Sequence, residues 1–368
     1  MAAGPILVVN AGSSSLKFAN YDRQSLLPLA SGQVAQIGGE SELRFGKQCQ
    51  PISAPDHGAA LSAALAKLGE VSGPPSVVGH RVVHGGSMDQ PVLINPEFYA
   101  RLVAAAPMAP LHNPPALTVI DALHTLHPNL PQIACFDTAF HAQNPPEATT
   151  FALPEPLRDQ GLRRYGFHGL SYASVIRRFS ALTGLPLPPR LLVFHLGAGA
   201  SIAAVAGGMG VATTMGFSPL DGLTMATRAG SLDPGLLLHL LKQDGMSVER
   251  LETILNHESG LQALAGTPDM KTLLEADSDA ARFAVSHFTY WASRHAGAMI
   301  AAMQGVDGVV FTGGIGENAA PVRRAILDRL RWASVDIDRQ VWVIPADEEG
   351  EIAQSVAALT SPAVEQVV

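Results

Sequence analysis

The sequence predicts an α/β fold of two domains, and three observations support this prediction. The chain has 368 residues, which is more than one hydrophobic core usually organises. Apolar runs typical of strands alternate with helix-type segments along the chain. Two similar hairpin patterns, at residues 6–20 and 191–205, stand about half a chain apart and place a candidate domain boundary between them.

The first hairpin pattern starts with the apolar run Ile6–Val9, breaks into the small polar residues 10–15 and resumes at Leu16. The second has apolar residues 191–194, the loop His195–Ser201 and apolar residues 202–205. Each reads as strand, tight loop and strand. Their likeness suggests an ancient duplication.

Helices are predicted between these strands. Asn113 is predicted to cap a helix that opens with two prolines and stops before Pro128. A helix at Ser171–Thr183 should bury Val175, Ile176, Phe179 and Leu182 and end at Gly184. Further along, the pattern predicts a helix at 287–303, a buried strand at 309–311, a loop at 312–318 and a helix at 321–332.

Composition narrows the class of protein. Hydrophobic residues make up 47% of the chain, which is enough for two cores. Lys and Arg number 24 against 32 Asp and Glu, and no basic stripe is present, so we expect no nucleic-acid partner. Two cysteines exclude a disulfide framework and a four-cysteine zinc site. With no secretion signal at residues 1–10 and no long apolar run, we expect a soluble cytoplasmic protein without a membrane partner.

The first loop, residues 10–17, has the composition of a phosphate-binding turn. Its glycine and serines let the backbone approach phosphate oxygens and supply donors, and Lys17 adds a cation. An ordinary polar turn has the same composition. No P-loop follows a strand here, because the chain has no Gly-Lys-Ser or Gly-Lys-Thr at that position.

Two arginines occupy positions that favour an anionic ligand. Arg81 lies inside the apolar run Val77–Gly86, where burial is costly without an anion or an ion pair. Arg228 lies among small residues, where a ligand could approach the backbone. Together they could clamp a carboxylate and a transferring phosphoryl group, although each could equally serve a structural ion pair.

Histidines and carboxylates supply the remaining candidates. Four histidines lie beside turn residues: His84, His112, His168 and His195. Asp137 and Glu348 could hold Mg²⁺ directly or through water. Each of these side chains could instead be a structural hydrogen-bonding group or a solvated carboxylate.

Seven ordered blocks resemble the acetate kinase family, within the acetate and sugar kinase, heat-shock-70 and actin superfamily. They are the segments 6–18, 79–86, 111–115, 136–141, 164–169, 215–220 and 312–318. The first contains Asn-Ala-Gly-Ser-Ser-Ser-Leu-Lys and the second is Gly-His-Arg-Val-Val-His-Gly-Gly. The resemblance extends from residue 6 to about residue 353.

The resemblance implies roles for individual residues. The catalytic residues it implies are Arg81, Asp137, His168 and Arg228. The acid-binding residues are Arg81, Val83, Leu111, His112, Phe167 and Pro219, of which the four apolar ones form a methyl pocket. Asn10 and Glu348 resemble residues that position Mg²⁺. The nucleotide-binding residues are Ser13, Ser15, Lys17, His195, Gly197, Gly199, Asp269, Lys271 and the adenosine loop Gly313, Gly314, Ile315, Gly316, Glu317 and Asn318.

The resemblance also implies the architecture and the reaction. It implies two actin-like (ribonuclease-H-like) domains, 1–141 with 350–368 and 142–349, a nucleotide cleft between them, and a homodimer. The reaction is reversible in-line transfer of the γ-phosphoryl group of ATP to acetate, giving acetyl phosphate and ADP, with Mg²⁺ or substituting Mn²⁺. Seven residues differ from those usual in the family: Ala198, Asp221, Ala226, Ala229, Ser231, Leu232 and Lys271.

Alternatives stay open on the sequence alone. The acid could be propionate or butyrate, and the donor could be GTP or pyrophosphate. A non-catalytic nucleotide-binding protein of the same superfamily is the alternative from another class. The joint presence of Arg81, Asp137, His168 and Arg228 favours the enzyme.

Overall fold

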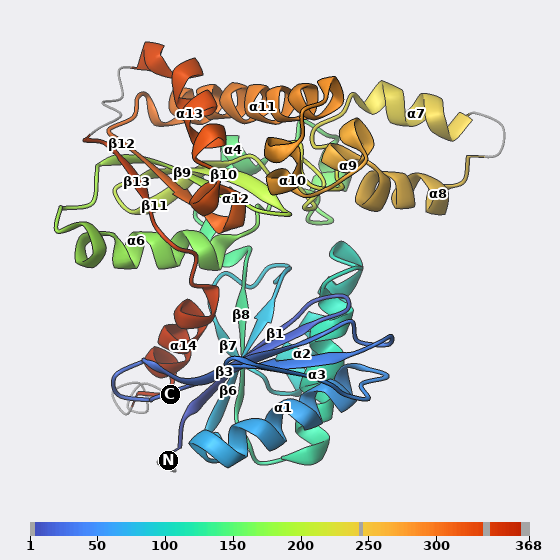
Figure 1. Cartoon of the computed structure of the whole chain (residues 1–368), viewed down its shortest axis with the longest axis vertical. Coiled ribbons are helices and arrows are strands. Elements are labelled where there is room, and N and C mark those ends of the chain that lie inside the picture. The colour runs from blue at the N-terminus through green and yellow to red at the C-terminus, as the bar shows by residue number, and fades with distance from the viewer. Residues whose placement is uncertain (1–3, 243–245, 334–338, 362–368) are drawn as a thin grey trace. The chain divides into compact units, whose positions relative to one another are not determined.

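The computed structural model describes residues 4–242, 246–333 and 339–361, whose contacts form two compact units (Figure 1). Among these residues, unit 1 contains 4–140, 169–174 and 347–361. Unit 2 contains 141–168 and the described part of 175–346. The first three and last seven residues of the predicted N-terminal domain lie outside the described residues.

Unit 1 is built on an eight-stranded sheet with the order β5-β4-β3-β2-β1-β6-β8-β7. Strand β1 is antiparallel to β2 and parallel to β6, which is in turn parallel to β8. The strands are β1 (Ile6–Ala11), β2 (Leu16–Tyr21), β3 (Pro28–Ala35), β4 (Glu42–Phe45), β5 (Gln48–Pro51), β6 (Val77–Val82), β7 (Val92–Leu93) and β8 (Gln132–Phe136).

Helices cover both faces of this sheet, because successive residues of a strand point to opposite faces. Leu7 and Val9 of β1 pack with helices α1 (His57–Ser72) and α3 (Asn113–Leu126). Ile6 and Val8 pack with α14 (Glu348–Leu359) on the other face (Figure 1). Helix α2 (Pro96–Ala105) and the 3₁₀ turns Ala106–Met108 and Ala139–His141 complete the helices along residues 57–141.

Unit 2 is built on a five-stranded sheet with the order β11-β10-β9-β12-β13. Its strands are β9 (Arg190–Leu196), β10 (Ala200–Ala206), β11 (Met209–Thr213), β12 (Gly308–Thr312) and β13 (Val341–Val343). The helices from residue 146 to 333 are α4 (Pro146–Thr149), α5 (Glu155–Arg158), α6 (Gly169–Thr183), α7 (Pro234–Lys242), α8 (Val248–Thr253) with the π-helical Ile254–Glu258, α9 (Gly260–Ala265), α10 (Met270–Glu275), α11 (Asp279–Met303), α12 (Gly313–Asn318), α13 (Ala320–Arg329) and a 3₁₀ turn, Arg331–Ala333. Helix α6 begins within unit 1 and continues into unit 2.

The two sheets share one topology. In unit 2, β9 is antiparallel to β10 and parallel to β12, which is parallel to β13. The order β11-β10-β9-β12-β13 therefore matches β3-β2-β1-β6-β8 of unit 1 strand for strand. The two hairpins predicted from the sequence are β1–β2 and β9–β10, and each lies at the centre of its sheet. This shared topology supports the predicted duplication.

Several predicted details were wrong. Asn113 is not the cap of α3, since His112 precedes the helix and the Asn113 side chain bonds the His84 backbone instead. Leu182 of α6 is exposed rather than buried. Residues 313–318 form helix α12 rather than a loop. The helix predicted at 287–303 already begins at Asp279, where the Ser278 side chain caps it.

The predicted end of α6 was confirmed. Gly184 ends α6 in the left-handed conformation, with φ 70°. Cys49 and Cys135 are free thiols. None of the helices in the described residues is long and apolar enough to cross a membrane.

Candidate active site

Arg81 and Asp137 form a paired charge at the ends of two neighbouring parallel strands of unit 1. Arg81 lies on β6, and Asp137 follows β8 directly. The guanidinium donates through Nη2 to Oδ2 at 2.7 Å and through Nε to Oδ1 at 3.2 Å. This two-point geometry fixes the plane of the guanidinium and leaves Nη1 for another partner.

Electrostatics keeps Arg81 charged. Burial works against the charge, but Asp137, Glu348 and Glu349 together raise the pKa of Arg81 above its ordinary value. Asp137 is fully buried, and burial raises the pKa of its carboxyl while Arg81 opposes that shift. The arginine predicted to contact the substrate is therefore held in place by a carboxylate that solvent does not reach.

The turn after β6 is held by side chains from elsewhere in unit 1. The Asn113 amide accepts from the His84 backbone N–H at 3.1 Å and donates to its carbonyl at 2.9 Å. Thr138 Oγ1 accepts from the Gly85 backbone N–H at 3.1 Å. These bonds fix the backbone directly after Val83, which is half-buried like Leu111 and His112.

Asn10, the predicted metal residue at the end of β1, lies beside the start of α14. Its amide Nδ2 donates to Glu349 Oε1 at 3.1 Å, and the neighbouring Glu348 acts electrostatically on Arg81. The amide oxygen of Asn10 and these carboxylates are the oxygen donors that Mg²⁺ prefers. In the described residues no group of three or more His, Cys, Asp or Glu side chains could hold a metal. That donor set fits an ion whose remaining ligands are phosphate oxygens and water.

The first loop is a tight turn between β1 and β2. The Gly12 backbone N–H donates to the Ser15 carbonyl at 2.8 Å, and the Gly12 carbonyl contacts His57 Nε2 at 2.8 Å. Ser13 and Lys17 are exposed and Ser15 is half-buried. The turn therefore presents its hydroxyls and its cation to solvent, as a phosphate-binding loop requires.

In unit 2, His168 has an unusual backbone conformation for a residue that is not glycine. Its φ is 58° and ψ 22°, in the left-handed region, directly before α6. Its Nδ1 lies 2.8 Å from Ser201 Oγ, and its ring stacks on His195 with centroids 4.1 Å apart. Strain of this kind occurs where the surroundings fix a functional side chain.

Arg228 lies close to His168 in unit 2. A Cβ placed on Gly199 would stand 3.2 Å from His168 Nε2 and 3.8 Å from Arg228 Nη1, so the bare glycine lies against both side chains. Arg228 Nη1 donates to the Pro219 carbonyl at 3.1 Å. Among the described residues no carboxylate pairs with Arg228, and burial lowers the pKa of its guanidinium.

A cavity of about 690 Å³ opens beside the loop between β9 and β10. It is lined by Gly197, Ala198, Asp269, Met270, Lys271, Leu274, Glu275, Gly314, Ile315, Asn318 and Ala319. Six of these residues were predicted to bind the nucleotide. A Cβ on Gly197 would stand 3.9 Å from the Gly314 backbone nitrogen, and one on Gly314 would meet no atom within 4 Å. Bare backbone therefore faces the cavity from two sides.

Two of the residues predicted to bind the nucleotide, Glu317 and Asp269, also make contacts that hold the local backbone. Glu317 Oε1 accepts from the backbone N–H groups of Gly313 at 3.0 Å and Ala346 at 2.9 Å. Asp269 caps α10 by accepting from the Lys271 and Thr272 backbones. The contacts of Glu317 had no signal in the sequence. The cap at Asp269 had one that was not used, because Asp before an apolar helical stretch is a capping signal.

The four residues of the predicted methyl pocket are divided between the units. Val83 and Leu111 belong to unit 1, whereas Phe167 and Pro219 belong to unit 2. Phe167 is 1% exposed and Pro219 is half-buried.

Sequence reasoning missed some residues that the structure places near these groups. Met270, Leu274, Glu275 and Ala319 line the cavity of unit 2. For Leu274, Glu275 and Ala319 the signal was their helical spacing from Lys271 and Ile315, and Met270 had no such signal. Ser201 contacts His168, and Glu349 contacts Asn10. These pairs are 33 and 339 residues apart in the chain, so no local pattern could join them.

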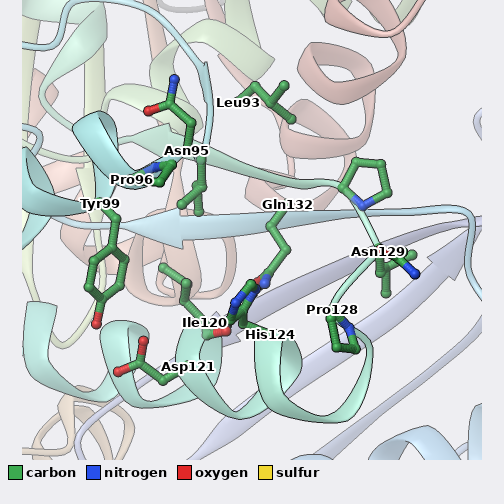
Figure 2. A pocket seen from close by; sticks show the side chains of 13 residues that line it. Leu93, Asn95, Pro96, Tyr99, Ile120, Asp121, His124, Pro128, Asn129 and Gln132 are labelled. Carbon is green, nitrogen blue, oxygen red and sulfur yellow. Dashed lines mark hydrogen bonds between the residues drawn. The ribbon is translucent and has the colours of Figure 1, made fainter.

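A second cavity, of about 530 Å³, contains none of the predicted site residues. Figure 2 shows Tyr99, Asp121 and His124 among the side chains that line it. Its wall includes Gln132, whose Oε1 lies 2.7 Å from Nε2 of the buried His80. His80 and Arg81 are neighbours on β6, and successive residues of a strand point to opposite faces of the sheet. The cavity therefore lies on the face of the sheet opposite to the Arg81 side chain.

Comparisons with known proteins agree on one family. A sequence model described as the acetokinase family matches residues 5–364. An acetate kinase of Rhodopseudomonas palustris is 41% identical over 387 aligned positions, covering 95% of this chain and 97% of that protein.

Two solved structures resemble this chain over nearly their whole lengths. The acetate kinase of Porphyromonas gingivalis matches with a TM-score of 0.87 at 32% identity, covering 97% of this chain and 100% of that one. A propionate kinase of Francisella tularensis matches with a TM-score of 0.88 at 31% identity, covering 96% and 98%. The α/β architecture with two sheets is thus the expected pair of actin-like domains, and the chain belongs to the acetokinase family.

Proposed function

We propose that the chain is an acetate kinase that reversibly transfers the γ-phosphoryl group of ATP to acetate, giving acetyl phosphate and ADP. The observation that carries this proposal is Arg228, a half-buried guanidinium without a carboxylate partner among the described residues, beside His168. A buried charge without a counter-charge is costly, and an anionic group that binds there offsets the cost.

The proposed chemistry is direct in-line attack of the acetate oxygen on the γ-phosphorus. Acetate is ionised at neutral pH, so no general base is needed and no covalent enzyme intermediate forms. The residues contribute positioning and charge. Arg81, oriented by Asp137, would hold the carboxylate, and Arg228 with His168 would stabilise the equatorial oxygens of the phosphoryl group in the transition state.

The histidine pair supports this assignment. His168 contacts Ser201 through Nδ1, which leaves Nε2 as the atom that faces Gly199 and the neighbourhood of Arg228. Nε2 can donate a hydrogen bond to a phosphoryl oxygen when it carries the proton. Stacking on His195 fixes the plane of the ring, so that little reorganisation accompanies the reaction.

Nucleotide binding is proposed for the cavity of about 690 Å³ in unit 2. Its volume lies within the range of small-molecule and cofactor sites. Bare backbone at Gly197 and Gly314 would contact the nucleotide, and Ile315 and Leu274 offer apolar surface for a base. Asn10 and Glu348, with Glu349 beside them, would position Mg²⁺, which neutralises charge on the phosphates when bound.

The acceptor is proposed to be a short carboxylic acid, with acetate first and propionate second. Val83, which follows Arg81 closely in the sequence, and Leu111 offer half-buried apolar surface in the same unit as Arg81. The likeness to a propionate kinase structure at a TM-score of 0.88 keeps propionate as the second candidate.

A cytoplasmic homodimer is proposed as the working form. Helix α7 has the sequence Pro-Gly-Leu-Leu-Leu-His-Leu-Leu-Lys, yet none of its residues is buried within the chain. Leu236, Leu238 and Leu241 are 43%, 58% and 38% exposed. An exposed apolar helix of this kind is typical of a protein–protein contact.

The test is a hydroxamate assay for acyl phosphate with purified protein, ATP, Mg²⁺ and a series of carboxylic acids. We expect acetyl hydroxamate with ATP and acetate, less product with propionate, and none without a nucleotide. Nucleotide binding without any acyl phosphate would instead support a non-catalytic nucleotide-binding protein. Product with pyrophosphate alone would reject ATP as the donor.

A further inference from the structure

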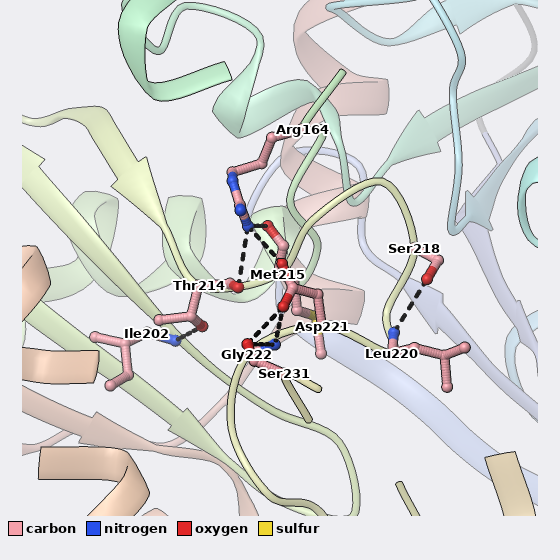
Figure 3. A network of polar contacts seen from close by, with 9 residues as sticks. All are labelled: Arg164, Ile202, Thr214, Met215, Ser218, Leu220, Asp221, Gly222 and Ser231. Atoms are coloured by element: carbon pink, nitrogen blue, oxygen red, sulfur yellow. Dashed lines mark hydrogen bonds and ion pairs between the residues drawn. The ribbon is translucent and has the colours of Figure 1, made fainter. Parts of the chain in front are cut away.

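A network of polar contacts in unit 2 surrounds the base of the loop that carries Arg228 (Figure 3). Arg164 donates through Nη1 to the carbonyls of Thr214 at 3.2 Å and Met215 at 2.8 Å. The same nitrogen contacts Asp221 Oδ2 at 2.9 Å. One guanidinium thus joins the segment that leads to His168 with the start of the Arg228 loop.

Asp221 and Ser231 close the loop at its two ends. Ser231 Oγ donates to Asp221 Oδ1 at 2.6 Å, and the same oxygen accepts from the Gly222 backbone N–H at 2.8 Å. The Ser231 backbone N–H donates to the Gly222 carbonyl at 3.0 Å. Residues 222–231 are therefore tied into a closed loop with Arg228 near its end.

Glycines allow the two ends to approach each other. Gly222 has φ 103° and Gly230 has φ 79°, a conformation that favours glycine. A Cβ on Gly230 would stand 2.5 Å from the Gly222 carbonyl oxygen. The two glycines permit this close approach of the loop ends, and the hydrogen bond between Asp221 and Ser231 holds the ends together.

Arg228 depends on this backbone for its position. Among the described residues its side chain donates to the Pro219 carbonyl and the Met225 sulfur, both within the same stretch of chain. Met225 N–H also donates to the Arg228 carbonyl at 3.0 Å, which closes a turn around the arginine. A shift of the loop base would move the guanidinium away from His168.

We propose that Arg164, Asp221 and Ser231 form a clasp of positioning residues for the phosphoryl transfer. Arg164 stands four residues before His168, and Ser231 stands three residues after Arg228. The clasp fixes these two catalytic side chains relative to each other without contacting the substrate. This inference rests on the proposed function of Arg228 and His168.

The experiment measures steady-state kinetics of Ser231→Ala and of Ser231→Thr, which keeps the hydroxyl. Ser293→Ala is the matched control, because the buried Ser293 hydroxyl donates to the Thr289 carbonyl of its own helix and lies outside the clasp. We expect Ser231→Ala to lower kcat by about 10- to 100-fold, since misplacement of a catalytic group by about 1 Å has such an effect. The KM for ATP should change less than about twofold, because the nucleotide cavity has no residue of the clasp.

A double variant separates positioning from general destabilisation. In an Arg228→Ala background, Ser231→Ala should have little further effect on kcat, because residues that act through one group are not additive. Independent, multiplying losses in the double variant would overturn the proposal. Near-normal kcat in folded Ser231→Ala and in Asp221→Asn would overturn it too.

Amide hydrogen exchange gives a readout that does not need activity. The clasp predicts faster exchange of a peptide spanning 216–231 in Ser231→Ala and in Asp221→Asn, but not in Ser293→Ala. Unchanged exchange would reject the clasp even in an active enzyme. If the wild type is inactive on every acid but Ser231→Ala and Asp221→Asn still exchange faster than it, the proposed function would be rejected and the clasp would be supported as the anchor of the loop.

Discussion

The Nη1 atom of Arg228 donates a hydrogen bond of 3.1 Å to the carbonyl oxygen of Pro219. Pro219 is one of the apolar residues predicted to contact the acyl group, and Arg228 is the cation predicted to face the phosphoryl group. The bond joins these two predicted functions in one short stretch of backbone. A substitution at either residue should therefore alter the position of the other.

Replacement of Arg228 tests the charge directly. Arg228→Ala should lower kcat by roughly two to four powers of ten, as expected when a preorganised charge donor is lost. Arg228→Lys should recover little of this, because a point charge does not replace the guanidinium fork. Steady-state kinetics on folded protein measures both, with Arg324→Ala on exposed α13 as the control. A folded Arg228→Ala enzyme with ordinary turnover would remove this residue from the mechanism.

Val83 tests the choice of acid. Val83→Ala should improve the use of propionate and butyrate relative to acetate, because it enlarges the proposed methyl pocket. One methylene in such a pocket is worth about 1–3 kcal/mol, so the ratio of kcat/KM values should move roughly tenfold or more. The exposed Val103 on α2 gives a control, Val103→Ala, that should leave the ratio unchanged. An unaltered ratio in Val83→Ala would place the acyl group elsewhere.

Ala198 tests the nucleotide cavity. Its side chain is exposed at the cavity wall, and its carbonyl accepts from the Ala226 backbone N–H at 3.1 Å. An asparagine there could donate a hydrogen bond to the nucleotide, worth about 0.5–1.5 kcal/mol or up to roughly tenfold in affinity. Ala198→Asn should therefore lower the KM for ATP and leave the KM for acetate nearly unchanged. Ala301→Asn on the exposed surface of α11 is the control. Equal changes in both KM values would argue against this site.

The buried His80 should make the free energy of unfolding depend on pH. Burial lowers the pKa of His80 to about 4, although its hydrogen bond with Gln132 opposes the shift. Between pH 6.5 and 4 the unfolded chain binds a proton at this residue and the folded chain does not. The free energy of unfolding should therefore fall as pH falls through that window, by about 1.4 kcal/mol per pH unit from this residue. Urea unfolding of wild type and His80→Gln between pH 6.5 and 5 should show a smaller slope in the variant, and equal slopes would contradict the prediction.

Helix α7 tests the proposed dimer. Leu238→Lys puts a charge on an apolar surface that is 58% exposed in the single chain, so the free monomer should tolerate it and a buried contact should not. Light scattering after size-exclusion chromatography should show a dimer for wild type and a shift toward monomer for the variant. Leu126→Lys, at a similarly exposed leucine of α3, should stay dimeric. A dimer that both variants retain would place the contact on another surface.

Local patterns in the sequence predicted much of this protein. The strands, the two hairpins and the end of α6 at Gly184 follow from apolar runs, small polar loops and glycine, because these features act over a few residues. The start of α11 was missed although its cap, Ser278, is local, whereas the failed cap at Asn113 depended on a contact from outside the segment. Asn113 reads as a helix cap, but its amide bonds the His84 backbone, which a local pattern could not foresee.

The family motifs predicted four catalytic residues, Arg81, Asp137, His168 and Arg228. They did not predict which side chains or backbone groups hold these residues in place. Among the described residues, Arg81 pairs with a buried carboxylate, whereas the Arg228 side chain bonds a carbonyl and a sulfur nearby in the chain. The structure also gives His168 a serine partner on β10. The Arg81–Asp137 and His168–Ser201 pairings join residues 56 and 33 positions apart, and burial then sets whether each charge is neutralised or left for a ligand. The sequence by itself therefore determined which chemical groups are present, whereas only the tertiary structure decided their neighbours and the low-dielectric surroundings in which they act.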